Sequence, residues 1–154
     1  MHTVYVGDAK DVVKRIRSQH CGGNVESSAL RKHIAQCKGY RLKIIQRSSG
    51  SRRVRIDFPE PETGERNISD YIRAGSWQVA LCFGYDEAHD FQWYLIQQLN
   101  PLLNVTRKPW NSLNEQRYKM LHEKMKTTSA LTYAELTKDF SGPGVYVLYH
   151  DELP

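Results

Sequence analysis

The beginning of the chain contains a short strand pattern, a glycine and a helix pattern in immediate succession. Residues Thr3 to Val6 alternate between polar and apolar side chains, as a half-buried strand does, and Gly7 interrupts them. Asp8 stands where a helix N-cap belongs, with Asp11 beside the same free amide groups. The sequence therefore predicts a strand, a turn and a helix within residues 3–17.

The predicted helix has one apolar stripe and several basic side chains. Val12, Val13 and Ile16 recur at the spacing of a helix face that packs on a core. The other faces carry the positive charges of Lys10, Lys14, Arg15 and Arg17.

Length and composition limit the class of protein. A chain of 154 residues with 40% hydrophobic residues can bury a substantial core, so we expect one domain over residues 1–154. The net charge of +5 favours a polyanionic partner, although proteins without such a partner share this excess. Three cysteines without CxxC spacing favour a reducing compartment. With no signal-peptide pattern and no apolar run of membrane-span length, we expect a soluble cytoplasmic protein.

The rest of the chain alternates between helix and strand patterns. This predicts an α/β (α+β) fold with a small central antiparallel sheet flanked by helices. The strongly apolar strand at 77–83 belongs in the middle of the sheet, and a linker-like break is expected at 59–64. We expect helices at 26–38, 67–74, 90–99, 113–126 and 133–139, and further strands at 40–46, 52–58 and 144–149, of which the first two could pair as a hairpin. The expected helix ends are a cap at Ser27 or Ser28, closure at Asn100-Pro101, and capping boxes of Ser112 with Glu115 and of Thr132 with Glu135.

Two short motifs at opposite ends of the chain resemble a nuclease signature. Tyr5-Val6-Gly7, with Arg15 ten residues after Tyr5, is similar to the second half of the GIY-YIG endonuclease signature. Only two residues precede Thr3, which leaves no room for the first half. Gly144-Val145-Tyr146 resembles that half. The resemblance implies a circularly permuted order, with the N-terminal and C-terminal strands paired antiparallel.

A third motif agrees with the family except at one position. Leu95, Ile96, Pro101 and Asn104 stand at the family's spacing, but Gln92 occupies the position of its glutamate. Asp90 cannot substitute, because it lies about 200° away around the helix. Whether Gln92 is natural or engineered is left open.

The resemblance implies metal-dependent hydrolysis of DNA phosphodiester bonds. It assigns Tyr146 as the general base, Tyr5 as a residue that positions water or phosphate, and Arg15 as the phosphate ligand. We expect Arg15 and the metal to lower the pKa of the phenol. A Mg²⁺ or Mn²⁺ ion would bind at residue 92, where the neutral amide of Gln92 predicts an inactive form. His20 is a candidate contact for the phosphate or the leaving group.

Two other functions compete with the nuclease. The chain would be a non-catalytic nucleic-acid-binding module if Gln92 is taken at face value, or an unrelated interaction protein if Tyr5 and Tyr146 are only a core pair. The oligomeric state is open and includes a homodimer. For a DNA partner, expected as duplex, the predicted contacts are Lys10, Lys14, Arg17, Arg52, Arg53 and Asn104.

Overall fold

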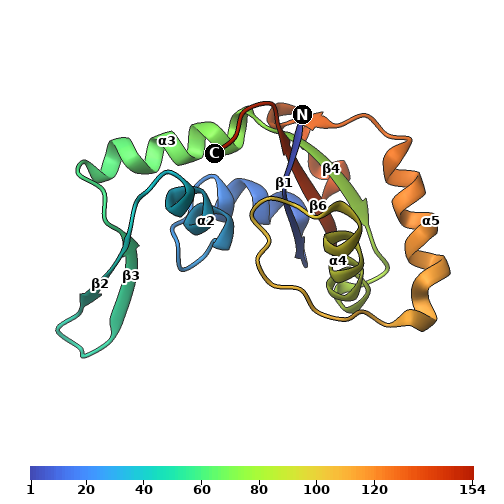
Figure 1. Ribbon diagram of the computed structural model, residues 1–154, viewed down its shortest axis with the longest axis horizontal. Coiled ribbons are helices and arrows are strands. Elements are labelled where there is room, and N and C mark those ends of the chain that lie inside the picture. Colours follow the sequence, from blue (N-terminus) through green and yellow to red (C-terminus); the bar gives the residue numbers. More distant parts are fainter. The chain divides into compact units, whose positions relative to one another are not determined.

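The computed structural model describes all residues from Met1 to Pro154. The chain divides into two compact units, and most of their helices and strands are labelled in Figure 1. The first unit contains residues 1–15 and 74–153, and the second contains residues 16–73. That residues 1–154 fold as one domain stays a prediction.

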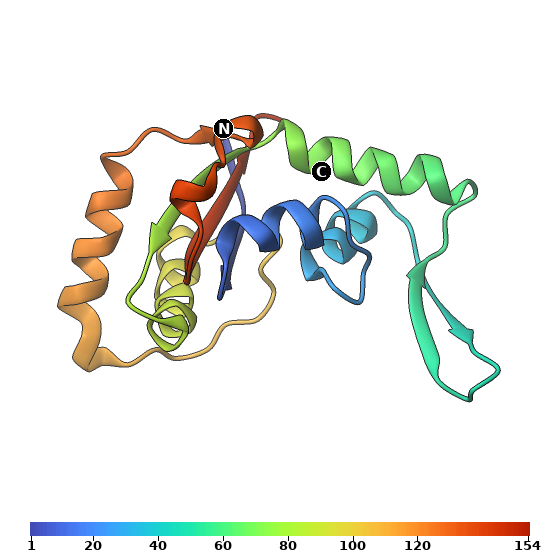
Figure 2. The ribbon, with the colours of Figure 1, turned by 180° about the vertical axis from the view of Figure 1, so that it is seen from behind.

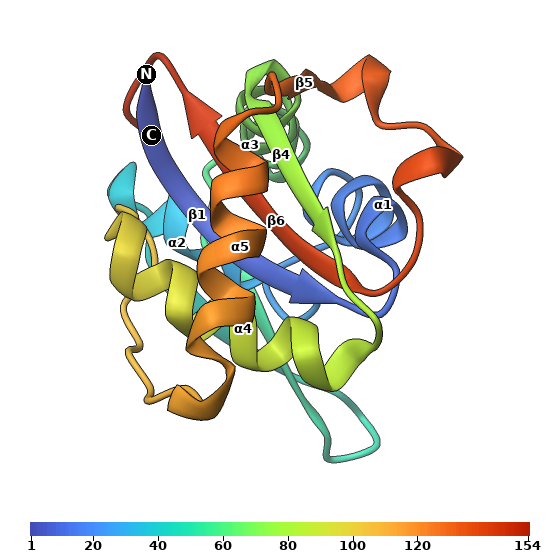
Figure 3. The ribbon, with the colours of Figure 1, turned by 90° about the vertical axis from the view of Figure 1, so that its right-hand side faces the viewer.

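A four-stranded antiparallel sheet forms the centre of the first unit. Its strands are β1 (His2–Ala9), β6 (Gly144–His150), β4 (Ser76–Leu81) and β5 (Leu131–Thr132), in that order across the sheet (Figure 3). β6 pairs with β1 from His150 opposite His2 to Gly144 opposite Ala9. The predicted antiparallel pairing of the two terminal strands is confirmed, and so is the place of β4 inside the sheet.

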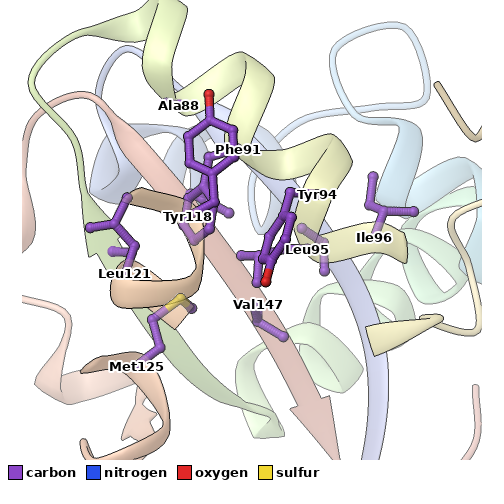
Figure 4. Packing of buried hydrophobic residues seen from close by; sticks show 12 residues of the cluster. Ala88, Phe91, Tyr94, Leu95, Ile96, Tyr118, Leu121, Met125 and Val147 are labelled. Carbon is purple, nitrogen blue, oxygen red and sulfur yellow. The ribbon is translucent and has the colours of Figure 1, made fainter. Parts of the chain in front are cut away.

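Two helices, α4 (Tyr85–Leu99) and α5 (Glu115–Lys126), contribute the core of the first unit. Successive side chains of a strand point to opposite faces, so Val145 and Val147 face these helices while Tyr146 points to the other side. α4 ends at Asn100, whose left-handed backbone closes the helix as predicted. Figure 4 shows Ala88, Phe91, Tyr94, Leu95, Ile96, Tyr118, Leu121, Met125 and Val147 packed together.

The segment after α4 covers the free edge of β1. The backbone N–H groups of Leu102 and Leu103 donate to the carbonyls of Thr3 and Val4 at 3.1 and 2.9 Å. The Asn104 side chain then bonds to both backbone groups of Val6, accepting from its N–H at 2.8 Å and donating to its carbonyl at 2.9 Å. A side-chain amide carries the same donor and acceptor as a peptide group, so Asn104 continues the pairing without a strand.

The first helix begins later than the sequence predicts. β1 continues through Asp8 to Ala9, and α1 covers only Val12–Lys14. The N-cap is Asp11, whose carboxylate accepts from the Lys14 backbone N–H at 3.2 Å. The prediction that Asp8 caps this helix is therefore wrong. Residues Arg15–His20 continue as a π-helix.

The second unit contains two helices and a hairpin, seen from behind in Figure 2. Helix α2 (Ala29–Cys37) is capped by Ser28, one of the two predicted caps. The hairpin pairs β2 (Leu42–Gln46) with β3 (Arg52–Ile56), as predicted. The expected break at 59–64 is wrong, because α3 covers Pro61–Ala74. Proline suits the first turn of a helix, where its missing N–H has no partner to lose.

A buried arginine connects the helices of the second unit. Arg31 on α2 is 1% exposed and donates to the Ser69 hydroxyl on α3 at 2.8 Å and to the His20 carbonyl at 2.9 Å. Its guanidinium also pairs with the Glu65 carboxylate. A buried charge is tolerated only when it is paired and hydrogen-bonded, so this network requires α2 and α3 to keep their register within the unit.

The last part of the chain is less helical than predicted. A 3₁₀ turn at Ser112–Asn114 precedes α5, and its cap is Asn111 in place of the predicted Ser112. The helix expected at 133–139 is instead two 3₁₀ turns, Tyr133–Glu135 and Lys138–Phe140. The capping box predicted for Thr132 and Glu135 is present. Among the helices of this chain, none has the length and apolar character that crossing a bilayer would require.

We predict that Asn104→Ala lowers the free energy of unfolding by about 1–3 kcal/mol, because it leaves two backbone groups of Val6 without partners. Chemical denaturation measures this change. The exposed Gln98→Ala on α4 is the control and should change stability by less than about 0.5 kcal/mol. Equal stabilities for the two variants would contradict a structural role for Asn104.

Candidate active site

The ring of Tyr146 lies against the backbone of Gly7. The two residues are directly opposite in the β1–β6 register. A Cβ atom at residue 7 would overlap the hydroxyl and ring carbons of Tyr146. Only glycine lets this ring lie across the strand, so the glycine of one motif makes room for the tyrosine of the other.

Tyr5 and Tyr146 come together on the same side of the sheet, as the sequence predicts. Their ring centres are 6.4 Å apart. β1 has an irregularity between Thr3 and Tyr5, where two steps along β1 match one step along β6. This bulge sets which side chains of β1 share a face with Tyr146.

The pKa of Tyr146 is raised well above the ordinary value of a phenol. Burial is the main cause, and the neighbouring Tyr5 adds to it, while the charge and hydrogen bond of Arg15 act in the opposite direction. The pKa of Tyr5 is also raised by burial, against the lowering effect of Arg15. Arg15 therefore acts in the predicted direction without outweighing burial, and a lowering of the pKa by Arg15 together with a metal ion stays a prediction.

Gln92 is hydrogen-bonded to Asp8. Its side-chain N–H donates to Asp8 Oδ2 at 2.9 Å, and the same oxygen is 2.7 Å from His89 Nδ1. Gln92 is 8% exposed, and the Asp8 side chain is 14% exposed. The carboxylate of Asp8 also acts on the phenols, because its charge raises the pKa of both Tyr5 and Tyr146. Asp8 therefore links Gln92 electrostatically to the tyrosines.

The side chains around Gln92 do not fit a resident Mg²⁺ ion. A magnesium site needs hard oxygen ligands, usually with one or two carboxylates. Residue 92 offers a neutral amide whose N–H points at Asp8, and this carboxylate oxygen already has a second partner in His89. No group of three or more His, Cys, Asp or Glu side chains in the chain is arranged to hold a metal ion.

Two other residues expected at the site have structural contacts. His20 is fully buried in the second unit, where its Nδ1 lies 2.7 Å from the Ser28 hydroxyl. Both polar atoms of the Asn104 side chain bond to Val6. A phosphate or leaving-group contact for His20, and a DNA contact for Asn104, stay predictions.

The basic residues expected to contact DNA occur in both units. Lys10 and Lys14 are exposed in the first unit, and Arg52 and Arg53 are exposed on the hairpin of the second. Arg17, also in the second unit, is half-buried. Their contact with DNA stays a prediction.

Sequence reasoning missed Asp8 and His89 as neighbours of Gln92. His89 precedes Gln92 by three residues, a spacing that brings side chains together on a helix surface, so this contact had a signal in the sequence. Asp8 is 84 positions from Gln92, and its acidic side chain also suited a local cap. Nothing local distinguished the two roles.

The geometry agrees with the comparison to known families. The family model of the GIY-YIG catalytic domain matches residues 1–128 of the sequence. The chain belongs to the GIY-YIG family. Curated proteins and solved structures gave no match.

Membership in the GIY-YIG family places the chain among nucleases, whose substrates are nucleic acids and which generally use divalent metals. The match includes β1, which carries Tyr5 and Gly7, and α4, which carries Gln92, and it ends before β6. The pairing of β6 with β1 brings Gly144-Val145-Tyr146 next to the matched part. A permuted order of the signature stays a prediction.

We predict that Gly7→Ala destabilises the protein by about 1–3 kcal/mol, because the added methyl group overpacks against the buried ring of Tyr146. Denaturant unfolding of both single variants and the double variant Gly7→Ala/Tyr146→Ala measures the coupling. The cost of Gly7→Ala should largely disappear in the Tyr146→Ala background.

Gly84→Ala is the matched control for this cycle. Its backbone is extended and no atom lies within 4 Å of an added Cβ, so it should leave stability nearly unchanged. Additive effects of Gly7→Ala and Tyr146→Ala would contradict direct packing between the two residues.

Proposed function

We propose that this protein binds DNA phosphodiesters at a GIY-YIG endonuclease site whose hydrolytic step is disabled by Gln92. The observation that carries this proposal is the hydrogen bond between Gln92 and Asp8 beside the two tyrosines and Arg15. The cluster retains groups suited to binding a phosphate, while residue 92 lacks the charge of the family's glutamate.

Arg15 is the proposed phosphate ligand. Its guanidinium already interacts with Tyr146, which holds it beside the phenols. A planar guanidinium can donate two parallel hydrogen bonds to phosphoryl oxygens. Hydrolysis increases the negative charge on these oxygens, so the same group would bind the transition state more strongly than the ground state.

Tyr146 is the proposed general base, and its raised pKa acts against this role in the form that carries Gln92. A base must accept a proton from the attacking water, which a protonated phenol cannot do. Burial keeps Tyr146 protonated at neutral pH despite Arg15. More positive charge near the ring would be needed to release that proton, and the neutral side chain of Gln92 lacks the negative charge that would hold a cation there. In this form the Tyr146 hydroxyl can only orient a water or a phosphate.

A non-catalytic binding module is the second candidate function. One observation favours it: the Gln92 amide lies between Asp8 and His89, 2.9 Å from the carboxylate oxygen and 3.2 Å from His89 Nδ1. An amide satisfied in this way is an arrangement that a chain adapted to glutamine would keep. The two candidates differ in what a carboxylate at residue 92 does.

We predict that Gln92→Glu cleaves DNA in the presence of Mg²⁺ or Mn²⁺ and that EDTA abolishes the cleavage. The substitution would place a second carboxylate against Asp8 at nearly constant volume. Two adjacent carboxylates repel each other and favour a cation between them. A gel assay measures cleavage. Gln92→Glu combined with Tyr146→Phe or with Arg15→Ala should not cut.

Metal binding is measured independently by thermal unfolding. Mn²⁺ should raise the melting temperature of Gln92→Glu and leave that of the protein with Gln92 nearly unchanged, because a ligand stabilises only the state that binds it. If Gln92→Glu folds, binds DNA and still cuts nothing in either metal, the protein is a binding module built on a nuclease fold.

We predict that Arg52→Glu/Arg53→Glu weakens DNA binding for all sequences and flattens its salt dependence, because both side chains are exposed on the hairpin and would contact phosphates. Fluorescence anisotropy at two salt concentrations measures both effects. Lys124→Glu/Lys126→Glu on α5 changes the net charge equally and is the control. Equal losses for the two double variants would show that only the net charge matters.

A further inference from the structure

A largely exposed phenylalanine follows the central strand β4. Phe83 is 86% exposed, in the short connection between β4 and α4. Its segment is anchored on both sides: the Cys82 backbone N–H donates to the Pro143 carbonyl at 2.9 Å, and the Phe83 N–H donates to the Glu87 carboxylate at 3.3 Å. The ring is therefore presented to solvent by a backbone that is held in place.

An arginine supports the Phe83 ring. The guanidinium carbon of Arg117 on α5 lies 4.5 Å from the ring centre, within the range of a cation–π contact. Arg117 is itself fixed by the Glu87 carboxylate, to which it donates at 3.2 and 3.5 Å. A single exposed apolar residue needs no explanation, but a ring braced by a paired arginine is pre-organised for a flat ligand.

A second aromatic residue, close to Phe83 in the sequence, contacts the surroundings of the active site. Tyr85 is 36% exposed and lies two residues further along the chain. Lys10 Nζ lies 5.6 Å from the centre of the Tyr85 ring. The ring centres of Tyr85 and His89 are 5.8 Å apart. His89 in turn contacts Asp8 at 2.7 Å. Contacts thus lead from the Tyr85 ring through His89 to the carboxylate beside Gln92.

We propose that Phe83 and Tyr85 form an aromatic platform on which an unpaired nucleobase stacks, next to the phosphate bound by Arg15. The inference rests on the proposed function, which supplies a nucleic acid at this site. Aromatic rings interleaved with cations are the usual surface for single-stranded nucleic acid, because every base has a face that can stack while lysine and arginine hold the backbone. Here Lys10 and Arg117 accompany the two rings.

The platform specifies the structure of the substrate. In a fully paired duplex both faces of each base are covered by its neighbours, so an exposed ring finds no partner there. A base at a flap, a gap or a single-stranded end has a free face. The substrate class is therefore DNA with an unpaired nucleotide beside the bound phosphate, and the stacking itself is tolerant of sequence.

Binding of fluorescent oligonucleotides in EDTA tests the platform. One set is a fully paired duplex, and the other carries a single-stranded extension with 2-aminopurine, whose fluorescence falls when it stacks. Phe83→Ala should weaken binding of the extended DNA about 5- to 100-fold, as expected for loss of one stacked base, and should reduce the quenching. The affinity for the paired duplex should stay unchanged.

Two further variants separate stacking from apolar contact. Phe83→Tyr keeps a ring and should bind and quench as the native protein does, whereas Phe83→Leu should behave as Phe83→Ala. Normal quenching by Phe83→Leu, or normal binding by Phe83→Ala, overturns the platform while the proposed function stands. A native protein that binds neither DNA overturns both. Altered self-association of Phe83→Ala with unchanged DNA binding would make Phe83 a protein contact and overturn the proposal.

Discussion

The contact between the Tyr146 ring and the backbone of Gly7 is the constraint on which the candidate site depends. It joins the two ends of the chain, since Gly7 lies on β1 and Tyr146 on β6. It also places a polar hydroxyl group in the interior, where Tyr146 is 1% exposed. Because each side chain of β1 that points to the face of Tyr146 would occupy the space of its ring, the ring can cross β1 only where the opposing residue has no Cβ atom. The burial of the phenol across the paired terminal strands therefore requires this close approach.

Burial and charge act in opposite directions on the phenols, and burial is the larger effect. Arg15 favours the ionised forms of Tyr5 and Tyr146, but desolvation outweighs it and the negative charge of Asp8 adds to the unfavourable side. Above pH about 10, where an unfolded chain releases its tyrosine protons, the folded chain still holds these protons. Folding stability contributed by the two phenols is therefore present below this pH and is lost as the pH rises further.

Spacing in the sequence was sufficient to predict the main parts of the fold and the approach of Tyr5 to Tyr146. The motifs around Tyr5 and Tyr146 predicted the antiparallel pairing of the terminal strands, because each motif supplies half of one tyrosine pair. Local rules failed where a distant partner competes with a local one. Asp8 suits a helix cap as well as a contact with Gln92, and only the tertiary structure selects between them. Proline and glycine at 59–64 predicted a break in regular structure, but proline is also favoured at the first position of a helix, and Pro61 begins one here.

The bonds that residues 102–104 make along β1 have a consequence for how copies of this protein can associate. An exposed edge strand presents a row of free N–H and C=O groups to which another chain can add a strand. The backbone of Leu102 and Leu103 and the amide of Asn104 occupy this row on β1. At the opposite edge of this sheet, β5 has only two residues and offers few backbone groups to a strand from another chain. A second copy of the chain therefore cannot add a strand to the central sheet along residues 3–6 of β1 without displacing these bonds.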